Sequence, residues 1–316
     1  MFLFAAAEAG AAAWMAAVWR EINAPFAVAL SRIAFEHLQR LDALPASPTK
    51  LFESESCASR LVEEVKPEAV LLSATGKPQE QSLASICKVC DATVTQIVDT
   101  WDGYENRFGD VFPDYVAVID DRAEAECRSS GGPDAKYVHV GQPAWEAYSK
   151  LAPPESGRGE RFLFVGQPLQ AVFGQALGYD EVSVAAEVRE SLSSQAELRA
   201  RLTYLLHPAE QRAPTGYIET RNAKVALSEA ETVIGMFSSF LINGLLNGRR
   251  VVVIQPERGR DRFGPSRHGL LRKYDSASGV DWLARSDCDE AASKITNLLR
   301  GSRQRVIQHM EGTKCA

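Results

Sequence analysis

The stretch AVLLSATGKPQEQSLASICKVCDATVTQIV, which spans residues 69–98, decides the fold. Ala69–Ser73 is a short, continuous apolar run, typical of a strand that is buried on both faces. A turn with a glycine and a proline leads into Gln79–Cys90, where the apolar residues have helical spacing, and Thr93–Val98 is again strand-like. A strand, a helix and a second strand in this order predict two parallel strands joined by a helical crossover.

The same alternation extends in both directions from this stretch. In the first half we predict strands over Met1–Ala7, Pro25–Leu30, Tyr115–Ile119 and Tyr137–Val140, and helices over Gly10–Ile22, Ile33–Leu41 and up to Val65. A Pro- and Gly-rich segment, residues 151–159, then breaks the pattern and indicates a linker. After it we predict strands over Arg161–Val165, Leu202–Leu206, Thr232–Gly235 and Val251–Ile254, and helices over Gln195–Arg201, Ala223–Ala230, Phe237–Leu246 and Asp287–Leu299.

The two series of elements predict an α/β fold with two Rossmann-like α/β/α domains that face a cleft. We place the domains at residues 1–152 and 153–316, and a length of 316 residues agrees with about two domains. Because ligands of open α/β sheets bind beyond the carboxyl ends of the strands, the residues that follow predicted strands are the candidate site residues.

Composition narrows the class of protein. A net charge of −6 argues against a nucleic-acid binder, which needs a basic face. The apolar N-terminus lacks a basic segment and is interrupted by Glu8, so we interpret it as a buried strand rather than a signal peptide. No uncharged stretch reaches the roughly 18 residues of a membrane span. Six scattered cysteines predict reduced thiols and a cytoplasmic protein, with the Cys87-x-x-Cys90 pair in a structural role.

In the second half, His207 comes directly after the predicted strand Leu202–Leu206, with Pro208 and Glu210 behind it. A histidine at the carboxyl end of a strand could bond a phosphate oxygen or protonate a leaving phosphate, and Glu210 belongs to the same candidate binding group. The alternative is an ordinary strand end with an incidental histidine.

Gly235, Ser238 and Ser239 follow the next strand and lead into a predicted helix. The N–H groups of a helix N-terminus, together with a serine hydroxyl, could bind an anion. Plain helix capping by a serine is the alternative. Farther along, Gln255 and Arg258 lie in an arginine-containing loop after Val251–Ile254, which could reach phosphates or could be an ordinary solvated loop.

In the first half, Asp99 and Asp102 follow the strand Thr93–Val98, beside Trp101 and Tyr104. One carboxylate could act as general base towards an acceptor hydroxyl, while the aromatic rings stack on a sugar face. Asp99 as a turn or helix cap is the alternative.

Glycines at two further places bear on the site. Gly10, after the first strand, could let a ligand approach the backbone. Gly-Gln-Pro occurs twice after a strand, at residues 141–143 and 166–168, and we interpret both as tight turns. The sequence has no dinucleotide-binding glycine fingerprint after a strand and no zinc-binding helix motif, so we predict neither a cofactor nor a metal.

The pair His207-Pro208, followed by Ser238-Ser239, resembles the HP and serine motifs of bacterial GT-B sialyltransferases and polysialyltransferases, and CDP-glycerol-type transferases carry similar residues. The resemblance implies that His207 and the two serines hold the donor phosphate and that Asp102 is the base. Trp101 stands where that family has its first acid, which is a departure from its motif. The resemblance also implies that the C-terminal segment packs back across the first domain.

The function that follows is a metal-independent glycosyltransferase, with the donor on the second domain and the acceptor on the first. Expected partners are a CMP-, CDP- or UDP-linked sugar, a glycan or small-molecule acceptor, and a second copy of the chain as an open alternative to a monomer. A nucleotide-sugar 2-epimerase or hydrolase shares this layout, and a non-catalytic binding protein of the same fold is the third reading.

We predict that His207→Ala and Ser239→Ala both keep the fold and weaken nucleotide binding by roughly ten- to a hundredfold, because each removes a charge-assisted hydrogen bond to phosphate. Titration calorimetry on the two variants measures the loss. Unchanged affinity in both, with intact melting curves, would reduce the two motifs to an ordinary strand end and an ordinary helix cap.

Overall fold

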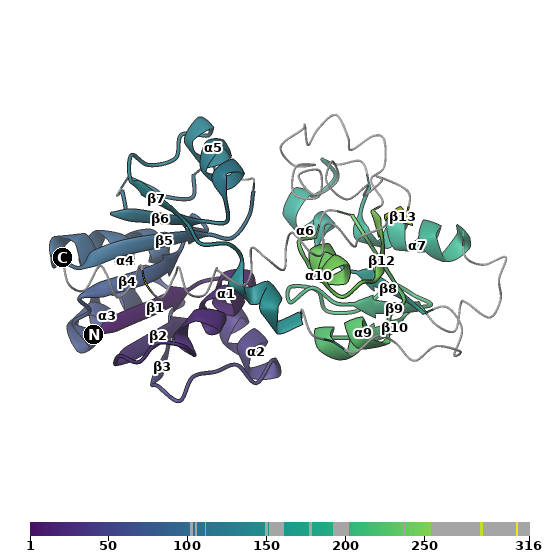
Figure 1. The fold of residues 1–316 in the computed structure, drawn as a ribbon, viewed down its shortest axis with the longest axis horizontal. Helices are drawn as coiled ribbons and strands as arrows, with labels where there is room; N and C mark the ends of the chain where they lie inside the picture. The colour runs from purple at the N-terminus through teal and green to yellow at the C-terminus, as the bar shows by residue number, and fades with distance from the viewer. Residues whose placement is uncertain are drawn as a thin grey trace. The chain divides into compact units, whose positions relative to one another are not determined.

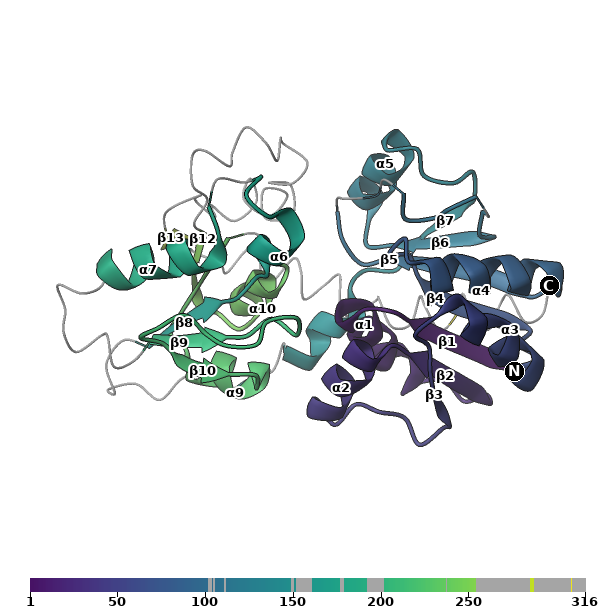
Figure 2. The same cartoon turned by 180° about the vertical axis from the view of Figure 1, so that it is seen from behind.

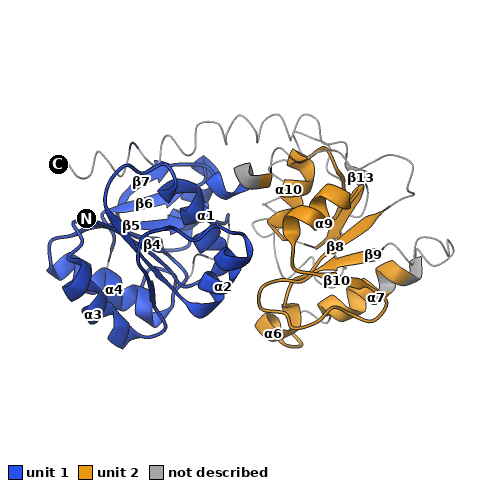
Figure 3. Cartoon of the chain, turned by 90° about the horizontal axis from the view of Figure 1, so that it is seen from below, with its two compact units in different colours: residues 1–147, 297–316 blue, residues 148–296 orange. Residues whose placement is uncertain are grey.

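The structure is a computed structural model, and it describes residues 1–101, 104, 106–110, 112–148, 151, 161–176, 179–191, 202–236, 238–253, 285–286 and 308. The chain separates into two compact units (Figure 3). The first includes Met1–Ala147, and the second includes the described residues from Tyr148 to Ser286. The predicted boundary at 152/153 and the predicted helices Gln195–Arg201 and Asp287–Leu299 lie outside the described residues.

The first unit is built on a parallel sheet whose seven described strands lie in the order β3-β2-β1-β4-β5-β6-β7 (Figure 1). Its strands are β1 Phe2–Ala6, β2 Phe26–Leu30, β3 Thr49–Leu51, β4 Ala69–Ser73, β5 Thr93–Val98, β6 Tyr115–Val118 and β7 Lys136–His139. Its helices are α1 Ala9–Trp19, α2 Arg32–Arg40, α3 Glu55–Val65, α4 Pro78–Val89 and α5 Asp121–Ser129, and a 3-10 helix spans Pro143–Tyr148. This strand order is that of a Rossmann fold.

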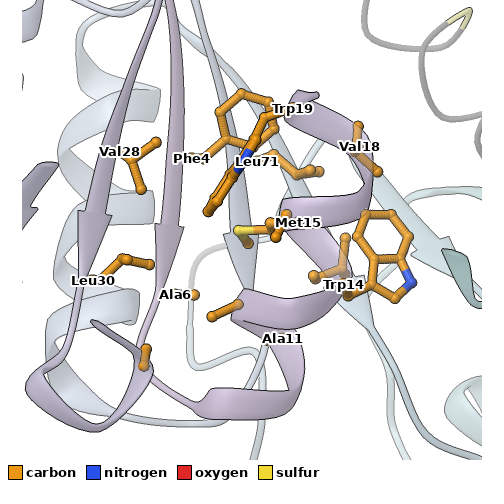
Figure 4. Close-up of a cluster of buried hydrophobic side chains, with 14 of the residues drawn as sticks. Phe4, Ala6, Ala11, Trp14, Met15, Val18, Trp19, Val28, Leu30 and Leu71 are labelled. Carbon is orange, nitrogen blue, oxygen red and sulfur yellow. The ribbon is translucent and has the colours of Figure 1, made fainter. Parts of the chain in front are cut away.

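Helices cover both faces of this sheet. On one face α1 lays its apolar side chains on the strands, and Figure 4 shows Trp19 beside Phe4 and Met15 near Leu71. The Trp19 ring meets that of Phe4 edge-on at 5.8 Å between centroids. The helix is buried along most of its length, as expected for an Ala-rich helix whose small side chains let it approach the sheet closely.

On the other face α3 and α4 lie side by side (Figure 2). Leu61, Val62, Leu83 and Cys87 from these helices pack against the second set of strand side chains. Burial raises the pKa of the Cys87 thiol to about 12, and Cys90 is exposed. The Cys-x-x-Cys pair therefore places one thiol in the core and one on the surface.

The second unit repeats the arrangement on a smaller scale. Its described strands lie in the order β10-β9-β8-β11-β12-β13, all parallel except that β13 pairs antiparallel with β12. They are β8 Phe162–Val165, β9 Leu202–Leu205, β10 Ile218–Thr220, β11 Thr232–Gly235, β12 Arg250–Val253 and β13 Arg285–Ser286. The helices are α6 Leu169–Phe173, α7 Glu181–Ser191, α9 Ala223–Glu229 and α10 Phe240–Leu246.

Apolar side chains cover both faces of this second sheet as well. Phe164, Tyr204 and Ile234 pack with α6 and α7 on one face. On the other, α9 contacts β9, and α10 contacts β11 and β12. The predicted α/β fold with two Rossmann-like domains is confirmed. Within the described residues, no helix is long and apolar enough to cross a membrane.

One helix begins later than predicted. We expected a helix from Phe237, but α10 starts at Phe240 and is seven residues long. The hydroxyl of Ser238 accepts a hydrogen bond from the Phe240 N–H at 3.2 Å, which holds the chain in a turn before the helix. Serine competes with helical backbone bonding in this way, so an apolar pattern alone sets the start too early.

Trp14→Ala tests the core beneath α1. Trp14 is 1% exposed, so we expect a loss of about 3–5 kcal/mol of unfolding free energy through lost burial and a cavity. The matched control is Val89→Ala at a position that is 85% exposed, where the change should stay within about 0.5 kcal/mol. Urea denaturation gives both values, and equal losses in the two variants would contradict the packing described.

Candidate functional site

Three turns of the second unit lie at the carboxyl ends of its strands. Gly166 begins the turn after β8, His207 the turn after β9, and Ser238 lies in the turn after β11. In the sheet, β8 lies between β9 and β11. Since paired strands are about 4.8 Å apart, the two turns are separated by roughly 10 Å at the sheet, with the Gly166 turn in the middle.

The strand order of the second sheet has a switch point, where ligands of open α/β sheets bind at the carboxyl ends of the strands. The chain runs outward from β8 to β9 and β10, then crosses to β11 on the other side of β8. Neighbouring strands whose connections leave in opposite directions leave a crevice beyond their carboxyl ends. Gly166 and Ser238 flank this switch point, and His207 is one strand away from it.

The His207 side chain is exposed and its ring is oriented by its own turn. The backbone N–H of Ala209 donates to His207 Nδ1 at 3.2 Å. Because Nδ1 accepts this bond, the neutral ring carries its proton on Nε2. The ring is thus set up as an Nε2–H donor.

Glu210 closes the same turn with its carboxylate. One oxygen accepts from the Tyr204 hydroxyl at 2.8 Å, and the other accepts from the His207 backbone N–H at 2.6 Å. Burial is the main cause that raises the pKa of Glu210, and the two hydrogen bonds act in the opposite direction. The carboxylate therefore serves the turn itself, whereas we had assigned it to substrate binding.

The rest of this loop is bonded to its surroundings along its length. The Arg221 guanidinium donates to the Glu210 backbone carbonyl, and the Arg189 guanidinium donates to the carbonyl of Thr215. The Tyr217 hydroxyl donates to the Ala185 carbonyl at 2.7 Å. His207 is thus carried by a loop that is anchored to α7 and to its own strand pair.

Ser238, Ser239 and Gly235 have different surroundings. Ser239 is exposed and occupies the N-cap position of α10, where its side chain makes no capping bond. Ser238 bonds the Phe240 N–H instead. A Cβ on Gly235 would lie 2.9 Å from Leu241 Cδ2, so this glycine is needed for the packing of α10 on the sheet.

The first unit has its own switch point, between β1 and β4. A buried carboxylate, Glu80 at the start of α4, spans it. Glu80 accepts from the Ala7 N–H at 3.3 Å, from the Thr75 N–H at 2.9 Å, and from the hydroxyls of Ser73 and Thr75. Burial raises the pKa of Glu80, and these four bonds oppose the rise.

The same network fixes the chain between β1 and α1. The Ala7 carbonyl accepts from the Ser31 hydroxyl at 2.8 Å and from Lys77 Nζ at 3.2 Å. Lys77 also pairs with Glu8 at 3.3 Å. The backbone at this edge is therefore held from three strands, and the exposed Glu8 is set at its end.

Asp99, at the end of β5, is the candidate base that the structure describes. Its carboxylate lies against Gly10, where a Cβ would be 3.0 Å from Asp99 Oδ2. Burial is the main cause that raises the pKa of Asp99, Glu8 adds to the rise, and Arg107 opposes it. Gly10 therefore contacts a carboxylate of its own chain through its bare backbone.

The two aromatic residues beside Asp99 belong to the core. Trp101 is 1% exposed, its indole N–H donates to Asp120 at 2.9 Å, and its ring stacks on Trp145 at 5.6 Å. Tyr104 is 2% exposed and its hydroxyl donates to the Thr100 carbonyl. The expectation that these rings stack on a sugar is wrong for the arrangement described, because neither ring presents a face to solvent.

Some predicted site residues lie outside the described part of the chain, namely Asp102, Gln255 and Arg258. The structure adds residues that the sequence analysis did not single out, above all Glu80, Lys77 and Arg107. Lys77-Pro78-x-Glu80 after an apolar strand was the signal for Lys77 and Glu80, since a charged residue at the start of a helix after a strand reaches the sheet edge, and we find no sequence signal for Arg107.

The described residues also bear on two other requirements, those of a metal site and of a pocket for a small ligand. Within the described ranges, no three His, Cys, Asp or Glu side chains come together as a metal site. A pocket of about 170 Å³ in the second unit is lined by Phe162, Thr203 and Glu229 among others, towards the amino ends of the strands. It is at the opposite end of the sheet from His207.

Comparison with known proteins gives structural matches alone. No family model matches the sequence, and no curated protein matches it.

The structural matches include two UDP-N-acetylglucosamine 2-epimerases and a wall teichoic acid polymerase. A candidate UDP-N-acetylglucosamine 2-epimerase from Listeria monocytogenes is 14% identical with a TM-score of 0.57, over 97% of this chain and 90% of that one. A second UDP-N-acetylglucosamine 2-epimerase is 11% identical with a TM-score of 0.57, over 96% and 90%. The wall teichoic acid polymerase TagF, soaked with CDPG, is 11% identical with a TM-score of 0.51, over 97% and 81%. At these identities the likeness concerns the fold alone, which is two Rossmann-like α/β domains in one chain.

Proposed function

We propose that this protein is a metal-independent glycosyltransferase, which moves a sugar from a nucleotide-sugar donor to a hydroxyl of a glycan or small-molecule acceptor. The observation that carries the proposal is the placement of His207 and Ser238 on turns that follow the two strands flanking β8. Ligands of such sheets bind at this edge, and both residues offer donors to a phosphate. The fold shared with UDP-N-acetylglucosamine 2-epimerases supports a nucleotide sugar as the class of substrate.

The donor is a CMP-, CDP- or UDP-linked sugar. Its phosphate would take hydrogen bonds from His207 Nε2–H and from the hydroxyls of Ser238 and Ser239. These groups stabilise the negative charge that grows on the phosphate as the bond to the sugar breaks. A neutral histidine donor suits this role, because it needs no proton from solvent to bind the anion.

Asp99 is the proposed base. Asp99 is half-buried as a residue, and its carboxylate accepts a hydrogen bond from its own backbone N–H. It takes the proton of the acceptor hydroxyl while that oxygen attacks the sugar carbon, and the nucleotide phosphate leaves with the bonding electrons. A raised pKa brings the carboxyl closer to the working pH, which makes it a stronger base.

A second candidate function is nucleotide-sugar 2-epimerisation or hydrolysis. It is favoured by the structural likeness, since the 2-epimerases match with a TM-score of 0.57 over 90% of their length, and the polymerase with 0.51 over 81%. Such an enzyme turns over its donor with no acceptor present, which separates it from a transferase.

A panel of CMP-, CDP- and UDP-sugars, with and without acceptors, tests the function. We expect nucleotide release that depends on an acceptor and persists in EDTA. Asp99→Asn should lower kcat by about 10²–10⁴-fold and leave nucleotide affinity unchanged, because the donor groups are on the other sheet. Asp110→Asn, an exposed aspartate in the same unit, is the control and should be as active as the parent. Release without acceptor supports the second function, and full activity of Asp99→Asn overturns the base assignment.

The pH dependence of kcat/KM tests the surroundings of Asp99. Only the ionised carboxylate accepts a proton, so activity should fall as the pH drops through the raised pKa of Asp99, above the usual range of an aspartate. Glu8→Gln removes a like charge and should move this acid limb to lower pH. Arg107→Gln removes the opposing charge and should move it to higher pH, while Arg107→Lys keeps the limb in place. An acid limb that ignores both charge changes would exclude Asp99 as the titrating group.

A further inference from the structure

Each oxygen of the Glu210 carboxylate accepts a hydrogen bond from a residue of its own turn or of the strand before it. The carboxylate accepts from the His207 backbone N–H at 2.6 Å and from the Tyr204 hydroxyl at 2.8 Å. The Glu210 backbone N–H in turn donates to the His207 carbonyl at 2.9 Å. The four residues His207–Glu210 are thus closed by two bonds that both join the first residue to the last.

The turn after the neighbouring strand leaves room for this carboxylate. Gly166, directly after β8, has a Glu210 carboxylate oxygen where any other residue would place its Cβ. The same Cβ would be 2.7 Å from a Tyr204 ring carbon and 2.8 Å from the Leu205 carbonyl. Since real Cβ atoms do not approach other atoms so closely, the placement of the Glu210 carboxylate depends on a glycine at position 166.

Closing the turn also sets the ring of His207. The Ala209 N–H, two residues along the same turn, donates to Nδ1 at 3.2 Å. That bond is available only while the turn keeps its shape, and it selects the tautomer with the proton on Nε2. A chain of bonds therefore runs from Glu210 through the turn backbone to the imidazole.

A direct role for Glu210 in holding a phosphate conflicts with its charge. A carboxylate beside a phosphate repels it, and this carboxylate has both oxygens on donors from its own chain. The Glu210 carboxylate lies against Gly166, and its negative charge strengthens the hydrogen bonds from the His207 N–H and the Tyr204 hydroxyl.

We infer that Glu210 is a positioning residue, which closes the His207–Glu210 turn over Gly166 and thereby fixes His207 as an Nε2–H donor. The importance of that donor for a nucleotide phosphate rests on the proposed function. The tautomer itself does not, so the two can fail separately.

Long-range ¹H–¹⁵N spectra of the full-length protein report the tautomer of each of its five histidines, and His207→Ala identifies the signals of His207. We expect the Nε2–H tautomer in the parent and a mixture of both tautomers in Glu210→Ala. Glu210→Gln keeps an oxygen for the His207 N–H and an amide for the Tyr204 hydroxyl, so it should restore the Nε2–H form. Glu219→Ala is the matched control, because its carboxylate accepts a backbone N–H of the same loop, that of Ala213.

Calorimetry with CMP, CDP and UDP gives the second readout. Glu210→Ala should weaken binding by about tenfold, Glu210→Gln by less than about threefold, and Glu219→Ala not at all. In the His207→Ala background, which keeps the backbone N–H, Glu210→Ala should cost nothing further, because its effect passes through the ring.

The outcomes separate the two ideas. An unchanged His207 tautomer in Glu210→Ala overturns the positioning role, whether or not nucleotides bind. Equal losses in Glu210→Ala and Glu210→Gln, or a full further loss in the His207→Ala background, overturn it as well, since the charge would then act on the ligand directly. A parent protein that binds none of the nucleotides but shows the expected tautomers refutes the proposed function alone.

Discussion

Parallel pairing is the constraint on which the rest of this structure depends. Except for β12 and β13, the described strand pairs of both sheets are parallel, so each connection between them must cross over a face of the sheet. The crossover helices bury the strands on both faces, and the strands become apolar along their length, as in β1 and β4. Polar side chains are then left to the ends of the strands. The chemistry of each unit is therefore gathered at one edge of its sheet.

At each of these edges a carboxylate is used to hold backbone rather than ligand. Glu80 bonds donors that follow β1 and β4 in the first unit, and Glu210 closes the turn after β9 in the second. Both are buried enough for their pKa to rise, and in both the hydrogen bonds oppose that rise. Because these two acids hold backbone, the proposed function assigns contact with the substrate to Asp99 and His207 instead. The sequence alone cannot separate an acid that bonds backbone N–H groups from an acid that acts on a substrate, because both roles use an Asp or Glu side chain.

Much of the fold was predictable, and the site was predictable in part. The central strands can be recognised in the sequence as apolar runs, because they are buried on both faces. Thr49–Leu51 gave no such signal, since it is a short edge strand with an exposed leucine, and α5 buries only Ala123 and Cys127. His207 and Asp99 were found because strand ends can be read from the sequence. The surroundings of Trp101 and the role of Glu210 could not be found, because they depend on directional bonds to Asp120 and on the space at Gly166, which come from other strands.

The anchored loop that carries His207 has a thermodynamic consequence. Bonds from Arg221, Arg189 and Tyr217 order it before any ligand arrives. Ordering a mobile loop on binding costs conformational entropy, roughly 1–2 kcal/mol for each residue fixed. Here that entropy has already been lost during folding, so the ordering of this loop is not subtracted from the interaction energy of an anion that binds there. Under the proposed function, donor binding at this edge therefore requires little rearrangement of the loop that carries His207.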